Sequence, residues 1–159
     1  MVNLTSDNIS YATTQNFLEL VKNNVSSVSV TNPKTNQSES HTIQFYHTKY
    51  NDQKLNSKSH YPCIIVELPN TPEDLFTFRK KQVAGNIDIQ VHCTNSLVTS
   101  KFHDLIKKTI EDNENWLKER GIYKVVKTAD EEDTVARNGF KDHWALSSYS
   151  FEFEFNYGN

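Results

Sequence analysis

The chain has 159 residues, of which 36% are hydrophobic, and its 17 basic and 20 acidic side chains give a formal net charge of -3. This length suits one domain that buries about two-thirds of its unfolded surface, so disulfides or metals are not needed to hold a core. The slightly acidic balance argues against a protein that wraps nucleic acid through a broad basic face. The local basic run Arg79 to Lys81 is better explained as the solvated start of a strand.

Cysteine usage and hydropathy limit the cellular location. Cys63 and Cys93 are too few for a disulfide framework, so we expect two buried, reduced thiols. Residues 1 to 10 lack a basic segment followed by an apolar run, and apolar runs such as Cys63 to Val66 are far shorter than the ~18 to 20 residues of a membrane span. We therefore expect a protein kept in the cytoplasm, or built into a particle there, with no membrane partner.

The first half alternates short ordered segments with polar connections. Apolar residues on one side of Ser6 to Asn24 predict a helix, and Val25 to Val30 begins a strand. Thr31 to Ser40 has almost nothing to bury and predicts a loop or hairpin arm. Two further strands are expected at Thr42 to Tyr46 and Tyr61 to Leu68, joined by a polar connection.

The segment from Val83 onward has the pattern of a strand followed by a long helix. Val83 to Cys93 alternates apolar and polar residues, as in a strand with one buried face. Ser96 to Leu117 repeats apolar residues three and four apart, which predicts one amphipathic helix of about six or seven turns. Gly121 follows, at a place where a residue in the left-handed conformation ends a helix.

The last part of the chain predicts a strand at Ile122 to Lys127, a polar, acid-rich loop at Ala129 to Asp142, and a long closing strand at His143 to Tyr157. Aromatic residues alternate along the closing strand. They must be covered by a helix or by another subunit, because an open aromatic edge would aggregate. As an oligomer interface we predict Tyr149, Phe151, Phe153, Phe155 and Tyr157.

Together these elements predict an α+β fold. We expect a mixed, mainly antiparallel sheet with two helices, in the order α-β-β-β-α-β-β. Residues 1–159 form a single domain in this prediction, with polar arms at about 31–59 and 129–142.

Side chains that could bind a metal or act as nucleophiles are poorly arranged for either role. His92 and Cys93 are neighbours in a strand and point to opposite faces, so they do not share an ion with His103. Neither Cys63 nor Cys93 has a helix N-terminus or a basic neighbour to lower its pKa. The acidic run Asp130 to Asp133 lacks the spacing and central glycine of a calcium loop. We expect no catalytic residue, no metal and no cofactor.

Two other functions stay open. The order helix, three strands, helix, strand also occurs in metal-dependent nucleases with an (Asp/Glu)-x-Lys signature, and here Glu67 and Asp88 would hold the divalent ion. However, the lysine of the signature is replaced by Gln90, which cannot supply a positive charge. The second alternative is a generic soluble interaction domain.

The order of motifs in the second half carries a resemblance to a known family. The segment Ile87 to His92 leads into the helix Ser96 to Leu117, which ends in Leu117-Lys118-Glu119-Arg120-Gly121-Ile122; a loop with Arg137 and an alternating last strand follow. In this order, Tyr61 to Tyr157 resembles the neck or tail terminator proteins of tailed bacteriophages.

This resemblance implies a structural virion protein, a small α+β subunit that closes into a ring, typically a hexamer. Such a ring ends polymerisation of the tail tube and joins the tail to the head connector, after assembly in the host cytoplasm. The implied partners are other copies of the chain, the tail tube protein, the head connector or adaptor protein, and genomic DNA that passes through the lumen without specific binding. An aromatic last strand and polar arms suit a sheet that continues onto a neighbouring subunit.

Overall fold

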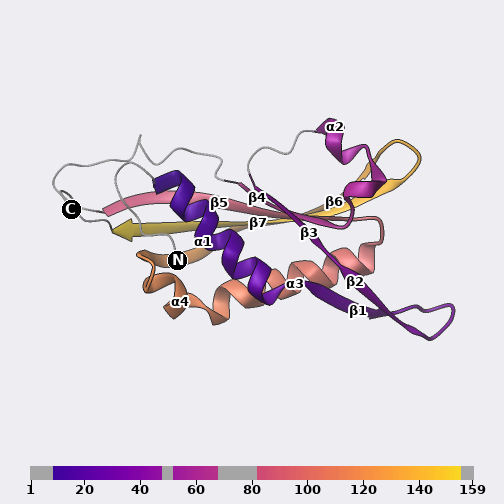
Figure 1. The fold of residues 1–159 in the computed structure, drawn as a ribbon, viewed down its shortest axis with the longest axis horizontal. Coiled ribbons are helices and arrows are strands. Elements are labelled where there is room, and N and C mark those ends of the chain that lie inside the picture. Colours follow the sequence, from indigo (N-terminus) through magenta and orange to yellow (C-terminus); the bar gives the residue numbers. More distant parts are fainter. Residues whose placement is uncertain (1–8, 48–51, 68–81, 155–159) are drawn as a thin grey trace.

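The structure, a computed structural model, describes residues 9–47, 52–67 and 82–154, where long strands form a sheet flanked by helices (Figure 1). The helices are α1 (Ile9–Asn24), α2 (Asp52–Leu55), the 3-10 turn η1 (Lys58–His60), α3 (Ser96–Asp112) and α4 (Glu114–Lys118). The strands are β1 (Ser27–Thr31), β2 (Ser38–Thr42), β3 (Gln44–His47), β4 (Cys63–Glu67), β5 (Gln82–Cys93), β6 (Ile122–Ala136) and β7 (Lys141–Glu154).

Within the described residues, the main sheet has five strands in the order β3-β4-β5-β7-β6. β3 and β4 are parallel, and the other neighbouring pairs are antiparallel. β1 and β2 form a separate two-stranded antiparallel sheet. The predicted α+β class with a mixed, mainly antiparallel sheet is therefore confirmed, but the predicted pair of helices omits the short helices α2 and α4. The predicted order α-β-β-β-α-β-β is also wrong, because five described strands, β1 to β5, precede α3 rather than three.

The long predicted helix is interrupted. Its start is stabilised by the Asn95 side chain, which accepts hydrogen bonds from the backbone amides of Leu97 (2.9 Å) and Val98 (3.4 Å). The helix ends at Asp112, and Asn113 has φ -113° and ψ 27°, outside helical values, before α4 begins. Gly121 follows with φ +81°, the left-handed conformation predicted for a residue that ends a helix.

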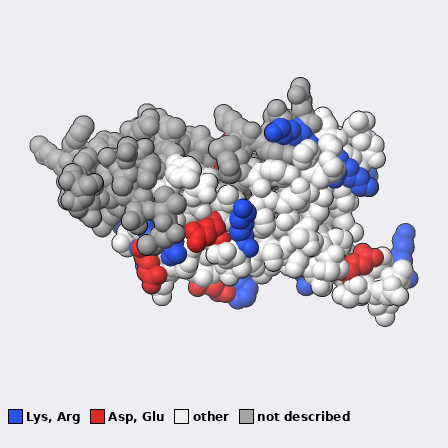
Figure 2. Space-filling view, in the orientation of Figure 1, with Lys and Arg blue, Asp and Glu red and all other residues white. Residues whose placement is uncertain are grey.

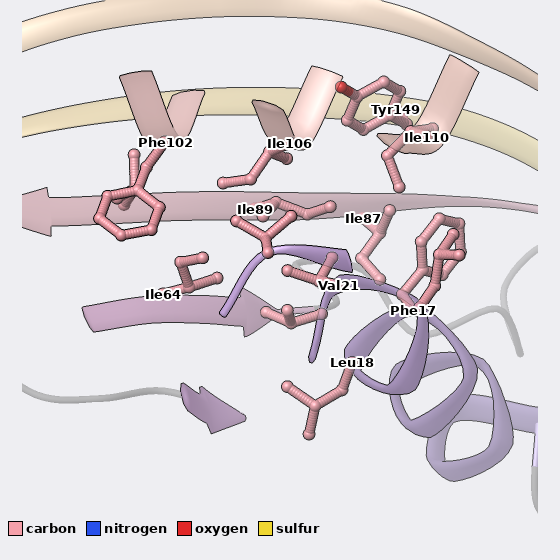
Figure 3. Close-up of a cluster of buried hydrophobic side chains, with 14 of the residues drawn as sticks. Phe17, Leu18, Val21, Ile64, Ile87, Ile89, Phe102, Ile106, Ile110 and Tyr149 are labelled. Carbon is pink, nitrogen blue, oxygen red and sulfur yellow. The ribbon is translucent and has the colours of Figure 1, made fainter. Parts of the chain in front are cut away.

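The main core lies between the sheet and the helices α1 and α3. Figure 3 shows Phe17 and Val21 of α1, Ile87 and Ile89 of β5, and aliphatic side chains of α3 pointing toward one another. The alternation predicted for β5 is confirmed from Gly85 to Cys93, where every second residue is buried. Burial of this apolar area is the main source of stability for a domain of this size.

A smaller core covers part of the opposite face of the sheet. Leu55, Tyr61, Cys63 and Ile65 form it, beneath the α2–η1 segment. Because Ile64 and Val66 face the main core while Cys63 and Ile65 face the smaller one, β4 is buried on both sides. This explains the uninterrupted apolar run at this strand.

The predicted acid-rich loop at Ala129 to Asp142 is wrong. β6 continues to Ala136, and its register with β7 is unbroken from Ala129 opposite Ser148 to Ala136 opposite Lys141. The turn is closed by the Arg137 amide, which donates to the Phe140 carbonyl (2.8 Å), and Gly139 has φ +80°. This half of β6 is mostly exposed on both faces, so its acidic side chains stay in water and cost little free energy. Main-chain pairing with β7 therefore determines that the segment is a strand.

The predicted polar arm at 31–59 is in part a hairpin. β1 and β2 pair from Ser27 opposite Thr42 to Thr31 opposite Ser38. Figure 1 shows this hairpin and the tip of the β6–β7 hairpin reaching beyond the body at the same end of the molecule. None of the helices in the described part of the chain is long and apolar enough to span a membrane.

We predict that Phe17→Ala strongly destabilises the fold. Phe17 is fully buried, and its ring centroid lies 5.6 Å from that of Phe151, so truncation loses apolar burial and leaves a cavity. The free energy of unfolding, measured by urea denaturation, should fall by about 3–5 kcal/mol. Leu97→Ala, at a position 51% exposed, is the matched control and should change it by less than about 1 kcal/mol. A Phe17→Ala loss as small as the control's would contradict this packing.

Candidate interaction surfaces

The aromatic residues predicted as an interface divide into two groups. Tyr149 and Phe151 are only 4% and 2% exposed and pack in the main core of their own chain. They are covered by helices of the same subunit, which was one of the two ways predicted for covering the ladder. The side chain of Phe153, and all of Phe155 and Tyr157, lie outside the described residues. The described half of the ladder therefore belongs mainly to the subunit's own core.

The two carboxylates of the nuclease alternative lie side by side. Glu67 of β4 pairs directly with Asp88 of β5. The Asp88 carboxylate accepts a hydrogen bond from the Ser148 hydroxyl (2.5 Å). The side-chain amide oxygen of Gln90, Oε1, lies 3.1 Å from His92 Nε2. Within the described residues, no group of three or more His, Cys, Asp or Glu side chains is placed to hold a metal ion. Glu67 and Asp88 could thus supply two metal ligands, while the side chain of Gln90 contacts His92.

A buried ionic cluster, which we call the Asp142 cluster (His92, Arg137 and Asp142), joins β5 to the turn of the β6–β7 hairpin. His92 Nδ1 lies 2.9 Å from one Asp142 carboxylate oxygen, and Arg137 donates to the same oxygen from Nε (3.2 Å) and Nη2 (3.0 Å). The Asp142 and His92 side chains are 0% and 4% exposed. The sequence draws attention to Arg137 only through a family resemblance, and nothing in its spacing from His92 predicts the contact.

The Asp142 cluster is connected to the smaller core. The Tyr61 ring packs edge-on against Phe140 at 5.0 Å between centroids, and its hydroxyl donates to the Leu55 carbonyl (2.8 Å). Burial opposes ionisation of Asp142, but hydrogen bonds and charge from His92, together with Tyr61 and Arg137, outweigh it and lower the pKa of this carboxyl. The cluster therefore fixes the turn end of the β6–β7 hairpin to the α2–η1 segment rather than serving as an open reaction site.

Both thiols are chemically inert in this environment. Cys63 and Cys93 are buried and unpaired with each other, as predicted. Burial is the largest cause that raises the pKa of the Cys93 thiol to about 12, and burial together with the Asp142 charge raises the pKa of Cys63 as well. Cys93 faces the main core while His92 lies at the opposite face beside Asp142, which confirms that the two point apart.

A second charged group, the Asp130 cluster (His103, Lys107, Lys127 and Asp130), lies where α3 meets β6. His103 Nε2 forms a short hydrogen bond with the Asp130 carboxylate, and the ammonium groups of Lys107 and Lys127 lie 3.2 and 3.1 Å from it. Burial would raise the pKa of Asp130, but the hydrogen bonds from His103, Lys127 and Lys107 outweigh it and hold the pKa at about 2. Asp130 thus ties β6 to α3 instead of contributing to a calcium site.

The outer side of β6 is one edge of the main sheet. Among the described strands β6 is terminal, so one row of its backbone groups faces away from β7. Its register shifts twice, between Tyr123 and Val126 and between Lys127 and Ala129, and Lys124 has φ +52°. Such bulges bend a strand locally. Beside them a cavity of about 410 Å³ opens between α3 and β6.

On the face shown in Figure 2, the charges of the described residues do not favour one sign. Figure 2 shows acidic and basic side chains in small groups beside one another on the face in view, without a continuous basic area among the described residues. The candidate basic run at Arg79 to Lys81 lies outside the described residues. The described face therefore adds no support for a nucleic-acid interface.

A scan against known protein families and a search of curated proteins found no match to the chain. Its function is therefore argued from its own geometry.

We predict that Asp142→Asn lowers the free energy of unfolding by about 3–5 kcal/mol, because it leaves the charge of Arg137 buried without this ionic partner. Urea denaturation at neutral pH measures the change. Glu131→Gln, at an exposed position of the same hairpin, is the control and should stay within about 0.5 kcal/mol of wild type. Equal effects of the two substitutions would show that the Asp142 cluster makes no specific contribution to the free energy of unfolding.

We predict an acid-dependent contribution from Asp130. Its folded-state pKa of about 2 is below the ordinary 3.8, so its stabilising effect is complete above the ordinary pKa and is lost as pH falls toward 2. The difference in urea midpoint between wild type and Asp130→Asn should be constant from about pH 5 to pH 6 and shrink between about pH 4 and pH 2. If the difference in urea midpoint stays the same between about pH 4 and pH 2, the ionised Asp130 carboxylate does not contribute to stability as predicted.

Proposed function

We propose that the chain is a structural subunit of a tailed bacteriophage, a tail terminator or neck ring protein that assembles with copies of itself. The observation that carries the proposal is the side of the molecule formed by β6. Among the described strands this one is terminal: it runs from Ile122 to Ala136, pairs on its outer side with no other described strand, and lies next to a cavity. The outer edge of a strand of this length can pair with another chain, and a second copy is one such chain.

The succession of elements in the second half supports the proposal. β5 leads through Asn95 into α3, Gly121 ends the helical segment, and β6 and β7 form the closing hairpin. This is the order of motifs on which the resemblance to neck and tail terminator proteins rests. The two hairpins that project from one end offer further contact surfaces for parts of a virion above or below a ring (Figure 1).

In the proposed particle the chain contacts other copies, closed into a ring such as a hexamer, and the ring contacts the tail tube protein and the head connector. Genomic DNA passes through the lumen. The exposed carboxylates of Glu131, Glu132 and Asp133 would repel phosphate if they faced this lumen, which allows passage without specific binding.

A metal-dependent nuclease is the second candidate, favoured by the direct pairing of Glu67 with Asp88. The pair lacks two parts of a catalytic site. Gln90 stands where the signature requires lysine, and no third metal ligand joins the pair among the described residues. The Glu67–Asp88 pair therefore supports a nuclease less strongly than strand β6 supports a subunit that assembles with copies of itself.

We predict that the purified chain forms closed oligomers as concentration rises, and that it does not cleave DNA. Sedimentation velocity over a concentration series should show multiples of the chain mass. Incubation of supercoiled plasmid with wild type and magnesium should leave the plasmid intact. Cleavage by wild type that is lost in Asp88→Ala would favour the nuclease, and a single-chain mass at every concentration would contradict the ring.

A further inference from the structure

Asn138 and Gly139 lie at the tip of the β6–β7 hairpin and are the one Asn-Gly pair in the sequence. Both residues are exposed, within the connection from Ala136 to Lys141. Figure 1 shows this tip reaching beyond the body of the molecule. Asparagine is a chemically labile residue, and a following glycine favours its reaction because no side chain shields the next backbone nitrogen. The tip therefore presents a reactive pair to solvent.

The reaction joins the backbone nitrogen of Gly139 to the side chain of Asn138. The nitrogen loses its proton to hydroxide and attacks Cγ of Asn138, the bond from Cγ to Nδ2 breaks, and ammonia leaves, so that a cyclic succinimide closes. Water then opens this ring at either carbonyl. The products at position 138 are an aspartate with the original backbone and an isoaspartate whose backbone runs through Cβ. Water is consumed and ammonia released, and no oxidant, metal or enzyme takes part.

The conformation of the turn leaves the two reacting groups unhindered. Among the described residues, no hydrogen bond holds the Asn138 side chain or the Gly139 backbone amide. A Cβ atom at Gly139 would meet no atom within 4 Å beyond its chain neighbours, so the space beside it is open. A type I′ turn, the usual tight turn of Asn-Gly, requires positive φ at both residues. Gly139 has φ +80°, but the described non-glycine residues with positive φ are Asn36 and Lys124, so Asn138 is outside this turn type.

A comparable pair elsewhere in the chain is held in place. Asn95 is exposed and is followed by Ser96, another small residue. Its side-chain oxygen accepts hydrogen bonds from the backbone amides of Leu97 (2.9 Å) and Val98 (3.4 Å) at the start of α3. These bonds fix the Asn95 side chain toward the helix, so its Cγ is not available to the next backbone nitrogen. Exposure alone therefore does not make the two asparagines equally reactive.

The residues on either side of the Asn-Gly pair connect the turn to the rest of the fold. Before the pair, Arg137 donates to the buried Asp142 carboxylate from Nε (3.2 Å) and Nη2 (3.0 Å). After the pair, the Phe140 ring packs edge-on against Tyr61 at 5.0 Å between centroids. The Arg137 amide also donates to the Phe140 carbonyl (2.8 Å). An isoaspartate lengthens the backbone between these two residues by one carbon, which disturbs their mutual hydrogen bond and both side-chain contacts.

We propose that Asn138 is a site of spontaneous deamidation in the folded protein, and that its isoaspartate product weakens the attachment of the hairpin turn to the Asp142 cluster. The reaction is irreversible, so the turn changes with the age of the molecule. Displacement of Arg137 leaves the buried Asp142 carboxylate with less compensation for its burial, which lowers the stability of the fold. The modified turn belongs to one of the two hairpins that project from the molecule (Figure 1).

Peptide mapping by mass spectrometry tests the modification on the full-length chain, incubated in mildly alkaline buffer either folded or unfolded in urea. A methyltransferase specific for isoaspartate identifies the product. In urea we expect both Asn138 and Asn95 to react, Asn138 first. In the folded chain Asn138 should react within about tenfold of its rate in urea, because an exposed turn opens at little cost, while Asn95 stays intact. A folded chain that keeps Asn138 intact over the time in which urea converts it would overturn the proposal.

A second experiment tests the effect of the product on the fold. Isoaspartate-containing protein, separated from fresh protein by ion exchange, should have a lower urea midpoint and faster hydrogen exchange at the Arg137 amide. Asn138→Gln, incubated in the same way, should keep both values, because its longer side chain cyclises far more slowly. Asn138→Asp supplies the new charge on a normal backbone and should also match fresh wild type. An unchanged midpoint of the isoaspartate form, or an equal loss in Asn138→Asp, would rule out the lengthened backbone as the cause.

Discussion

Pairing of β7 on both of its edges is the constraint on which the rest of the structure depends. On one side β7 pairs with the whole of β5, from Gln82 to Cys93, and on the other side it pairs with β6. This double pairing fixes which side chains face the helices, because a shift of one residue would turn Tyr149 and Phe151 out of the core. α1 and α3 then have a single apolar face to cover, and β6 is left as the terminal strand.

The polar chemistry inside the molecule follows from this sheet. The Asp142 cluster holds the turn of the β6–β7 hairpin to β5, and the Asp130 cluster holds the middle of β6 to α3. In both, a carboxylate is surrounded by cationic or hydrogen-bonding partners, which offsets the cost of its burial. These groups stabilise the position of β6 and its hairpin. The side chains of both clusters are thus engaged in holding β6 and its hairpin to the rest of the fold.

Sequence patterns predict the elements that bury one regular face. The alternation in β5 and the spacing of apolar residues in α3 follow directly from which side chains are buried. Gly121 has a positive φ, a backbone conformation that other residues rarely adopt. The sequence wrongly predicts a loop for the distal half of β6, because the side chains of this half are exposed on both faces and show no alternation. The break at Asn113 leaves no signal, since apolar spacing continues through it to Trp116 and Leu117.

The candidate site is less predictable than the fold. The cavity lies beside the register shifts between β6 and β7, and no local sequence pattern predicts this register. The aromatic alternation of β7 correctly indicates a face that needs cover, but Tyr149 and Phe151 are covered within the subunit.

Cryo-electron microscopy of the assembled full-length chain tests most directly whether the β6 side is where copies join. We expect closed rings in which β6 of each subunit is covered by the next subunit. Rings in which β6 and its cavity face solvent would contradict this role of the β6 side.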